Sequence, residues 1–272
     1  MKLSKKKLLN STQLSPSHRA YLLNYVNKMR NVRIYQLLII ITFIALWEIT
    51  THFGIIDSFV FSSPSRVILS FFEMAADGSI FYHIGITLLE TFISFTLVIL
   101  FGILGAVLLW WREGLAKVLE PYLVVLNSLP KTALAPVFIV WLGNNLKTII
   151  VAAVSVAVFG SIITLYTAFI NVEEDKIKLI HTLGGSKKDV LLKVILPSNI
   201  PTVISVMKVN IGLSLVGVII GEFLAAKAGL GYLIIYGSQV FKLDWVIMSI
   251  VILCILATGL YQLLAYFEKK YH

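Results

Sequence analysis

The feature that most limits how this chain can fold is a series of long apolar runs separated by short polar stretches. A run of about 20 apolar residues is the length that an α-helix needs to cross the hydrocarbon core of a bilayer. Each span must be helical, because lipid offers no hydrogen-bond partner to an exposed backbone group. We identify six predicted spans: Ile34–Thr51, Ile84–Trp110, Leu119–Leu142, Thr148–Ile170, Val203–Phe223 and Trp245–Tyr266.

Composition agrees with a membrane location. Hydrophobic residues make up 58% of the 272 residues, charged residues only 14%, and the mean hydropathy is +0.90. Even a compact soluble protein of this size buries only about three-quarters of the surface of its unfolded chain. A soluble fold would leave much apolar surface exposed to water, so the sequence predicts an all-α polytopic membrane protein.

The distribution of lysine and arginine predicts the orientation of the spans. With the N-terminus in the cytoplasm, 17 of the 23 basic residues lie in cytoplasmic segments and four lie in outer segments. This asymmetry follows the positive-inside rule, so both termini are expected to be cytoplasmic. Residues 1–33 are then a basic cytoplasmic tail, and residues 34–272 form the transmembrane domain.

The same distribution argues against several other functions. Basic residues that flank apolar spans meet anionic headgroups, so the net charge of +9 needs no nucleic acid. The single cysteine, Cys254, cannot form an internal disulfide, and no cysteine or histidine spacing suggests a metal site. The sequence has no G-x4-G-K-[ST] phosphate loop and no hydrolase or zinc-protease motif. We expect no catalytic residue, metal or cofactor in this chain, and a first span that is retained.

The polar segment 171–200 interrupts the apolar pattern and predicts a short helix that ends in a glycine turn. Acidic residues at positions 173–175 crowd the first turn, where negative charge favours a helix N-terminus. Gly184 and Gly185 can adopt the left-handed conformation that ends a helix.

A second short helix is predicted directly after this turn. Ser186 begins it, with Asp189 three residues later as the partner in a capping box. The helix carries an apolar stripe, formed by Val190, Leu191 and Val194. Pro197 discourages further α-helix after Leu196. By composition alone, the pair fits equally well as amphipathic helices that rest on lipid headgroups.

The amino-acid sequence of this loop resembles a known family signature. The spacing G-x9-V-x-L-P, from Gly184 to Pro197, is similar to the cytoplasmic signature E-A-A-x3-G-x9-I-x-L-P of the permease subunits of bacterial ABC importers. S-S-P-S-R-V from Ser62 resembles the family's outer-face segment before the second span. Three further segments resemble the sulfonate, nitrate and taurine branch of that family: L-P-K-T-A-L-A-P-V-F-I-V-W-L-G from Leu129, G-E-F-L from Gly221 and G-L-G-Y-L-I from Gly229. The resemblance covers about residues 55–266 and implies the six-helix transmembrane domain of an ABC importer.

In that family, the loop docks onto a separate ATPase subunit. The resemblance therefore implies that segment 171–200 couples this chain to ABC ATPase subunits, which hydrolyse ATP with Mg²⁺. The residues at the family's coupling positions are Lys178, Leu179, Ile180, His181, Gly184, Gly185, Leu196 and Pro197. It also implies an extracytoplasmic solute-binding protein, a second permease copy in a homodimer, and a location in the bacterial cytoplasmic membrane.

One coupling position departs from the family pattern. Lys178, Leu179 and Ile180 stand where the family usually has Glu-Ala-Ala. The charge reversal at Lys178 means that an ion pair between the family glutamate and an ATPase arginine cannot be carried over. We expect either that an acidic residue at 173–175 replaces it, or that the ATPase itself carries an acidic residue there.

The third predicted span contains the candidate residues for a solute path. Pro130 and Pro136 bracket Lys131 and Thr132, so the helix should be kinked or broken there. A lysine near the centre of a span costs about 2.5–3.5 kcal/mol, so Lys131 should avoid lipid. Either it helps an anionic substrate to pass, or it extends to the cytoplasmic edge of the membrane.

Two carboxylates lie in other predicted spans. Glu222, in G-E-F-L, is expected either to act in a gate or in packing, or to be a hydrated carboxylate at a helix end. Glu90 stands where relatives often carry a basic residue, and the sequence offers no physical reason for that exchange.

The resemblance implies a permease for a small anionic solute of the aliphatic sulfonate, nitrate or taurine type. The alternative is a thiamine-precursor pyrimidine or another small nutrient. A transporter driven by an ion gradient would need intramembrane coupling acids and usually inverted repeats, and neither is evident. An integral-membrane enzyme would need a catalytic cluster that the sequence does not contain.

Overall fold

The computed structural model describes residues 15–271, and every regular element in that range is helical. This confirms the all-α prediction. The helices in chain order are α2 (Pro16–His52), α3 (Ser58–Phe61), α4 (Pro64–Ala76), α5 (Ser79–Trp111), α6 (Glu113–Ser128), α7 (Lys131–Leu142), α8 (Leu146–Ile170), α9 (Glu174–Thr182), α10 (Lys187–Val190), the π-helix η1 (Leu191–Ile195), α11 (Leu196–Ser198), α12 (Ile200–Ala225), α13 (Leu230–Gln239) and α14 (Leu243–Tyr271). Contacts divide the chain into two units, Met1–Arg66 and Val67–His272.

In the described part of the first unit, α2 is one uninterrupted helix. Its apolar stretch, Asn24–His52, is long enough to cross a membrane and contains the first predicted span. The helix continues through residue 33, the expected boundary between tail and transmembrane domain, and that division stays a prediction. Near the end of α2, the Glu48 carboxylate accepts hydrogen bonds from the Ser65 amide and hydroxyl, at 3.0 and 2.8 Å.

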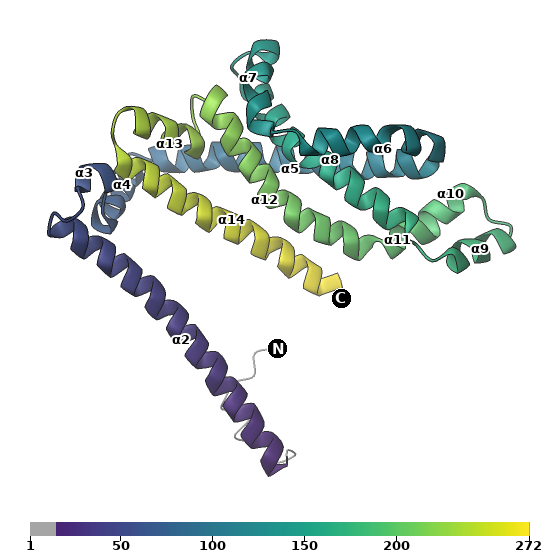
Figure 1. Cartoon of the computed structure of the whole chain (residues 1–272), viewed down its shortest axis with the longest axis horizontal. Coiled ribbons are helices and arrows are strands. Elements are labelled where there is room, and N and C mark those ends of the chain that lie inside the picture. Colours follow the sequence, from purple (N-terminus) through teal and green to yellow (C-terminus); the bar gives the residue numbers. More distant parts are fainter. Residues whose placement is uncertain (1–14, 272) are drawn as a thin grey trace. The chain divides into compact units, whose positions relative to one another are not determined.

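The second unit is a helical bundle built on α5, α8, α12 and α14. Each of these helices is long and apolar enough to span a membrane, and each contains one predicted span. Figure 1 shows α12 between α8 and α14, and α12 contacts α5 as well. The remaining predicted span is broken into α6 and α7, which meet at an angle of 96°. The break falls at Leu129 and Pro130, where the proline predicted it.

The helices α8 and α12 approach each other closely at two glycines of α12. A Cβ atom added to Gly217 would lie 2.6 Å from the Cα atom of Ala153, and one added to Gly221 would lie 2.9 Å from that of Ile149. Small residues at four-residue spacing let two helix backbones approach this closely, as is common in membrane bundles. The segment that connects α8 to α12, residues 171–199, therefore begins and ends on two tightly packed helices.

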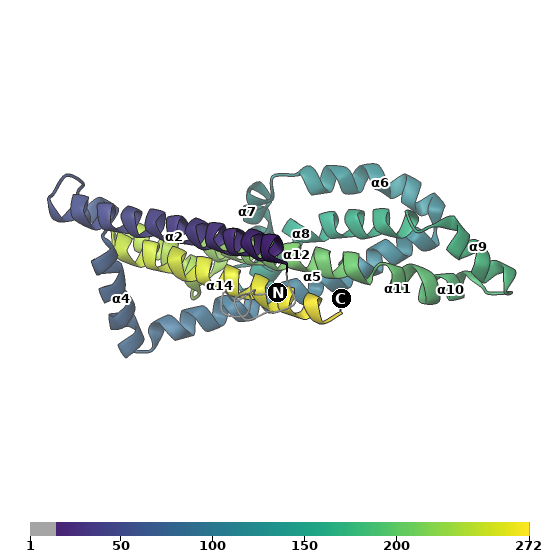
Figure 2. The same cartoon turned by 90° about the horizontal axis from the view of Figure 1, so that it is seen from below.

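Different short helices lie at the two ends of the bundle. Figure 1 shows α9, α10 and α11 at one end and α13 at the other, and Figure 2 shows α9–α11 extending beyond the ends of α8 and α12. A buried apolar cluster closes the α13 end, and it consists of Met74, Ile80, Leu215, Leu230, Leu233, Met248, Ile252 and Leu253. The Lys187 ammonium group donates to the Trp111 carbonyl at 2.8 Å, so two of the predicted cytoplasmic segments meet at the α9–α11 end.

We expect Gly217→Ala to destabilise the bundle, because the new Cβ would meet the backbone of α8. Overpacking of this kind costs about 1–3 kcal/mol, which should lower the midpoint of thermal unfolding in detergent. Gly212→Ala, in the same helix, is the matched control, because nothing lies within 4 Å of its added Cβ. Equal midpoints for the two variants would contradict the close packing of α8 on α12.

Candidate functional site

The α9–α11 segment (Glu174–Ser198) begins with the predicted acidic helix start. Glu174 and Asp175 lie in the first turn of α9, where they complement the unpaired N–H groups. The Lys178 ammonium lies 3.0 Å from the Glu174 carboxylate and 3.9 Å from that of Asp175. The acidic residue next to Lys178 is therefore on its own helix, one turn earlier. All three side chains are exposed, so this ion pair contributes little to stability.

The two glycines end α9 in different ways. Gly184 has a φ of +79°, the left-handed conformation predicted for it, whereas Gly185 does not have a positive φ. The Gly185 amide donates to the Ile180 carbonyl at 2.8 Å and the Gly184 amide donates to the His181 carbonyl at 2.9 Å. This pair of bonds is a Schellman motif. A Cβ atom on Gly185 would lie 2.8 Å from the Ile180 carbonyl oxygen, so both positions restrict the side chain.

The second helix starts with the predicted capping box. The Ser186 amide donates to the Asp189 carboxylate at 3.0 Å, and the Asp189 amide donates to the Ser186 hydroxyl at 3.4 Å. Hydrogen bonds from Lys193 and from Ser186 hold the pKa of the Asp189 carboxyl well below its usual range. A carboxyl group whose pKa is lower in the folded state than in the unfolded chain stabilises the folded state. This stabilisation is present in full above about pH 4, near the pKa of a free aspartate, and is lost as the pH falls below that value.

The prediction that Pro197 ends the helix is wrong. Helical backbone continues from α10 through η1 and α11 to Ser198. In η1 the Leu196 amide donates to the Leu191 carbonyl, five residues earlier, which widens the turn. The wider turn displaces the carbonyl that an α-helix would direct at the proline ring. The Asn199 side-chain amide then donates to the Ile195 carbonyl at 2.8 Å, which satisfies that group.

Apolar side chains fix the α9–α11 segment to the bundle. The predicted stripe is buried: Val190, Leu191 and Val194 are 1, 8 and 8% exposed. The cluster that joins the segment to α5, α8 and α12 consists of Ala106, Leu165, Phe169, Val190, Leu191, Ile195 and Val206, with Ile177 and Ile180 packed against it. Lys187 adds a polar contact, since its ammonium lies 5.4 and 5.8 Å from the rings of Trp110 and Trp111. The segment is therefore held by packing on both of its helices.

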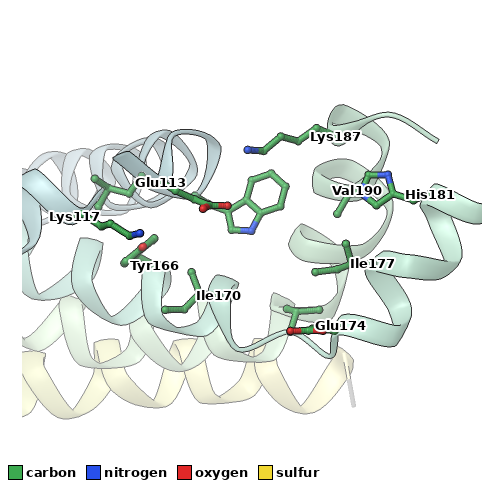
Figure 3. A pocket seen from close by; sticks show the side chains of 12 residues that line it. Glu113, Lys117, Tyr166, Ile170, Glu174, Ile177, His181, Lys187 and Val190 are labelled. Atoms are coloured by element: carbon green, nitrogen blue, oxygen red, sulfur yellow. The ribbon is translucent and has the colours of Figure 1, made fainter. Parts of the chain in front are cut away.

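A cavity of about 590 Å³ opens where this segment meets α5, α6 and α8. Figure 3 shows Glu113 and Lys117 of α6 on one side of it, and Ile177, His181 and Val190 of the α9–α11 segment on the other. His181, one of the expected coupling residues, thus faces the bundle side of its helix.

The opposite side of α9 carries an exposed apolar pair. Leu179 and Leu183 are 59 and 75% exposed and lie one turn apart on one face, and the exposed Lys178 lies on the adjacent face. Leu179 was expected from the family spacing, and Leu183 was missed, although its position four residues later was a usable signal. Among the other expected coupling residues, Pro197 is exposed and Leu196 is half-buried.

The candidate path residues cluster at the bend between α6 and α7. The Lys131 ammonium donates to the Leu126 carbonyl, near the end of α6, and lies 5.5 Å from the centre of the Phe159 ring. Its charge thus meets the negative end of a helix dipole and an aromatic face. Pro130, Thr132 and Pro136 are exposed. Their role in a solute path stays a prediction.

Glu222 lies in a buried polar network at the α13 end of the bundle. It is 1% exposed and accepts hydrogen bonds from the Thr87 hydroxyl at 2.7 Å and the Gly231 amide at 2.5 Å. Glu222 is therefore not a hydrated carboxylate at a helix end. A Cβ atom on Gly229 or Gly231 would collide with this side chain, which explains both glycines of G-L-G-Y. The network ties α5, α12 and α13 together.

Glu90 lies on α5, three residues after Thr87, at a buried position that the sequence did not indicate. It is 3% exposed, and its Oε2 has no hydrogen-bond partner in the described part of the chain. His83 extends the network, because its Nδ1 accepts a hydrogen bond from the Gly229 amide at 3.0 Å.

Together, the long apolar helices and the rigid helix pair fixed at one end of them define a polytopic membrane protein of the transport class. A family model described as the binding-protein-dependent transport system inner membrane component matches residues 98–272. The chain belongs to this family. It is a multi-pass permease of the ABC importer type in the cytoplasmic membrane.

Named relatives agree with this assignment. A probable ABC transporter permease protein of Haemophilus influenzae is 29% identical, covering 83% of this chain and 91% of the relative. The formylaminopyrimidine transport permease protein ThiX of Halalkalibacterium halodurans is 27% identical, covering 69 and 74%. The putative aliphatic sulfonates transport permease protein SsuC of Bacillus subtilis is 24% identical, covering 84 and 82%.

A solved structure shares the fold. A chain of the MetNI methionine ABC transporter, in an inward-facing conformation, superposes with a TM-score of 0.61 at 19% identity. The match covers 68% of this chain and 93% of that chain.

We expect Glu222→Ala to lower the midpoint of thermal unfolding in detergent, because it leaves the Thr87 hydroxyl and the Gly231 amide without an acceptor. An unsatisfied buried group costs about 1–3 kcal/mol. Glu222→Gln keeps one acceptor oxygen and should lose less. A midpoint of the alanine variant equal to that of the wild type would show that the network does not hold these helices together.

Proposed function

We propose that this chain forms the translocation path of an ATP-driven importer and receives the movement of a separate ATPase through the α9–α11 segment. The observation that carries the proposal is the way this segment is built. Its inner side is buried on the bundle, while its outer side presents Leu179, Leu183 and Lys178 to a partner. An apolar pair next to a charge is suited to a protein groove at the membrane surface.

The construction of the segment also suits the transmission of force. The Schellman turn and the capping box fix the angle between its two helices, and close packing prevents the segment from sliding on α8. A displacement of the outer side then moves the ends of α5, α8 and α12 together. Nucleotide binding to the ATPase shifts the bundle between two conformations, provided that the ATPase docks differently in each.

The partners follow from this role. The proposal includes two ATPase subunits that hydrolyse ATP with Mg²⁺, an extracytoplasmic solute-binding protein, and a second copy of this permease across the path. It places both chain termini and the α9–α11 segment in the cytoplasm, which the lysine and arginine distribution supports.

The solute is a small nutrient. The relatives include permeases named for aliphatic sulfonates, taurine, formylaminopyrimidine and riboflavin, so the names alone leave both anionic or zwitterionic sulfonates and uncharged heterocycles open.

We expect Gly184→Val to prevent co-purification of the ATPase with this chain. A valine resists a φ of +79°, so the turn between the two helices would open. Gly259→Val is the control, because Gly259 of α14 has open space around it and no positive φ. Intact assembly and ATP-dependent uptake in the Gly184 variant would contradict the docking role.

Lys178→Glu tests the charge reversal. The substitution places a glutamate one turn from Glu174, so it removes the local ion pair and presents a negative charge to the partner. If the ATPase groove carries an acidic residue there, transport-coupled ATP hydrolysis should fall several-fold; if it carries a basic one, hydrolysis should be kept or rise. Leu179→Ala, on the adjacent face of α9, reports the apolar contact separately.

A further inference from the structure

A second cavity, of about 330 Å³, lies between α6, α8 and α12, within the apolar helices of the bundle. Its lining contains an unusual concentration of amide and hydroxyl side chains for a membrane-spanning region. We call it the amide–hydroxyl groove, and its polar residues are Asn127, Ser161, Thr164, Ser205 and Asn210.

Two of these residues are paired with each other. The Asn210 side-chain amide donates to the Ser161 hydroxyl at 3.0 Å, and the two residues are 3 and 2% exposed. This bond joins α12 to α8 at the base of the groove. This hydrogen bond stabilises the wall of the groove and does not involve the polar side chains nearer the opening of the groove.

The other three polar side chains have no partner. Asn127, Thr164 and Ser205 are exposed, and within residues 15–271 none of them makes a side-chain hydrogen bond. Hydroxyls on the helices usually bond to a carbonyl of the preceding turn, as, for example, those of Thr91, Thr96, Ser128 and Thr258 do. An amide or hydroxyl that faces hydrocarbon without a partner costs several kcal/mol, so this face meets water or a polar ligand.

A glycine in the lining of the groove leaves space beside the Asn127 side chain. A Cβ atom on Gly160 would lie 3.1 Å from the Asn127 amide oxygen, so the missing side chain leaves room for that amide at the wall. Asn127 and Gly160 come from α6 and α8, so the opening forms only where these two helices pack.

Every residue that lines the groove in the described part of the chain is uncharged. Lys131, the lysine expected to attract an anion, does not line it, because its ammonium donates to the Leu126 carbonyl and lies over Phe159. An anion that leaves water needs a cation or several aligned donors in return. Amide and hydroxyl groups instead offer donors and acceptors in equal measure.

We infer that the amide–hydroxyl groove is a solute-contacting subsite of the translocation path, and that it accepts an uncharged polar solute with hydrogen-bond donors and acceptors rather than a sulfonate-type anion. The inference rests on the proposed importer function, and it names the substrate class. Of the solutes that the relatives are named for, it favours the uncharged heterocycles formylaminopyrimidine and riboflavin over the sulfonates.

Cysteine labelling tests this without knowledge of the solute. Thr164→Cys and Ser205→Cys are placed in a Cys254→Ala background, so that each variant carries a single thiol. The purified transporter, with its ATPase, is treated with uncharged methyl methanethiosulfonate or with anionic sulfonatoethyl methanethiosulfonate. Rates are divided by those of a free thiol with the same reagent. Thr258→Cys, on α14, replaces a hydroxyl that bonds to its own helix and is the control outside the groove.

We expect both groove cysteines to react with the uncharged reagent, and to react with the anionic reagent at least about tenfold more slowly, since the groove offers no cation. The control cysteine should react with neither. Equal relative rates for the two reagents would overturn the substrate class. No reaction at either groove cysteine would overturn the subsite, and would indicate that lipid or a second copy covers this face.

The proposed function has its own readout in the same preparation. Failure of the ATPase to co-purify with the unmodified chain would contradict the importer, whatever the labelling pattern. Co-purification together with rapid anionic labelling would keep the importer and reject only the uncharged solute.

Discussion

The function proposed for this chain depends on one apolar contact, the cluster that fixes the α9–α11 segment to the ends of α5, α8 and α12. Membrane helices can slide and tilt with little cost in lipid, because lipid tails are as apolar as the side chains they touch. A segment that is to move such helices must therefore be packed onto them. Here Ile195 and Val190, at 0 and 1% exposure, provide that packing on the second helix, and Ile177 and Ile180 provide it on the first.

The polar groups of the bundle differ in how they are bonded. Some are satisfied within the chain: the Lys208 ammonium donates to both Glu268 oxygens at 2.8 Å, and Glu222 is bonded to Thr87 and Gly231. These pairs hold α12 to its neighbours at both ends. Three side chains of the amide–hydroxyl groove, Asn127, Thr164 and Ser205, are different, because they are exposed and make no side-chain hydrogen bond in the described part of the chain. An exposed polar group that faced hydrocarbon would be costly, so we interpret this face of the bundle as one that meets water or a ligand.

The α9–α11 segment shows which kind of structure was predictable from sequence. The capping box of Ser186 and Asp189, the left-handed Gly184 and the buried stripe at Val190 were all predicted. Each depends on residues a few positions apart, where backbone geometry leaves few choices. The effect of Pro197 was predicted wrongly, because the π turn that accommodates it is stabilised by the packing of Leu191 and Ile195, which the local pattern does not describe.

By itself, the sequence determined the helical spans, the break before Lys131 and the local structure of the loop at residues 171–200, because hydropathy, proline and capping act over one or two turns of helix. Only the tertiary structure decided which polar side chains meet. Thr87 and Glu222, 135 positions apart, form one network because α5 and α12 pack together, and Asn127 opens into a groove because Gly160 leaves space beside it. Such contacts depend on how helices far apart in the chain are placed, and no local rule of spacing contains that information.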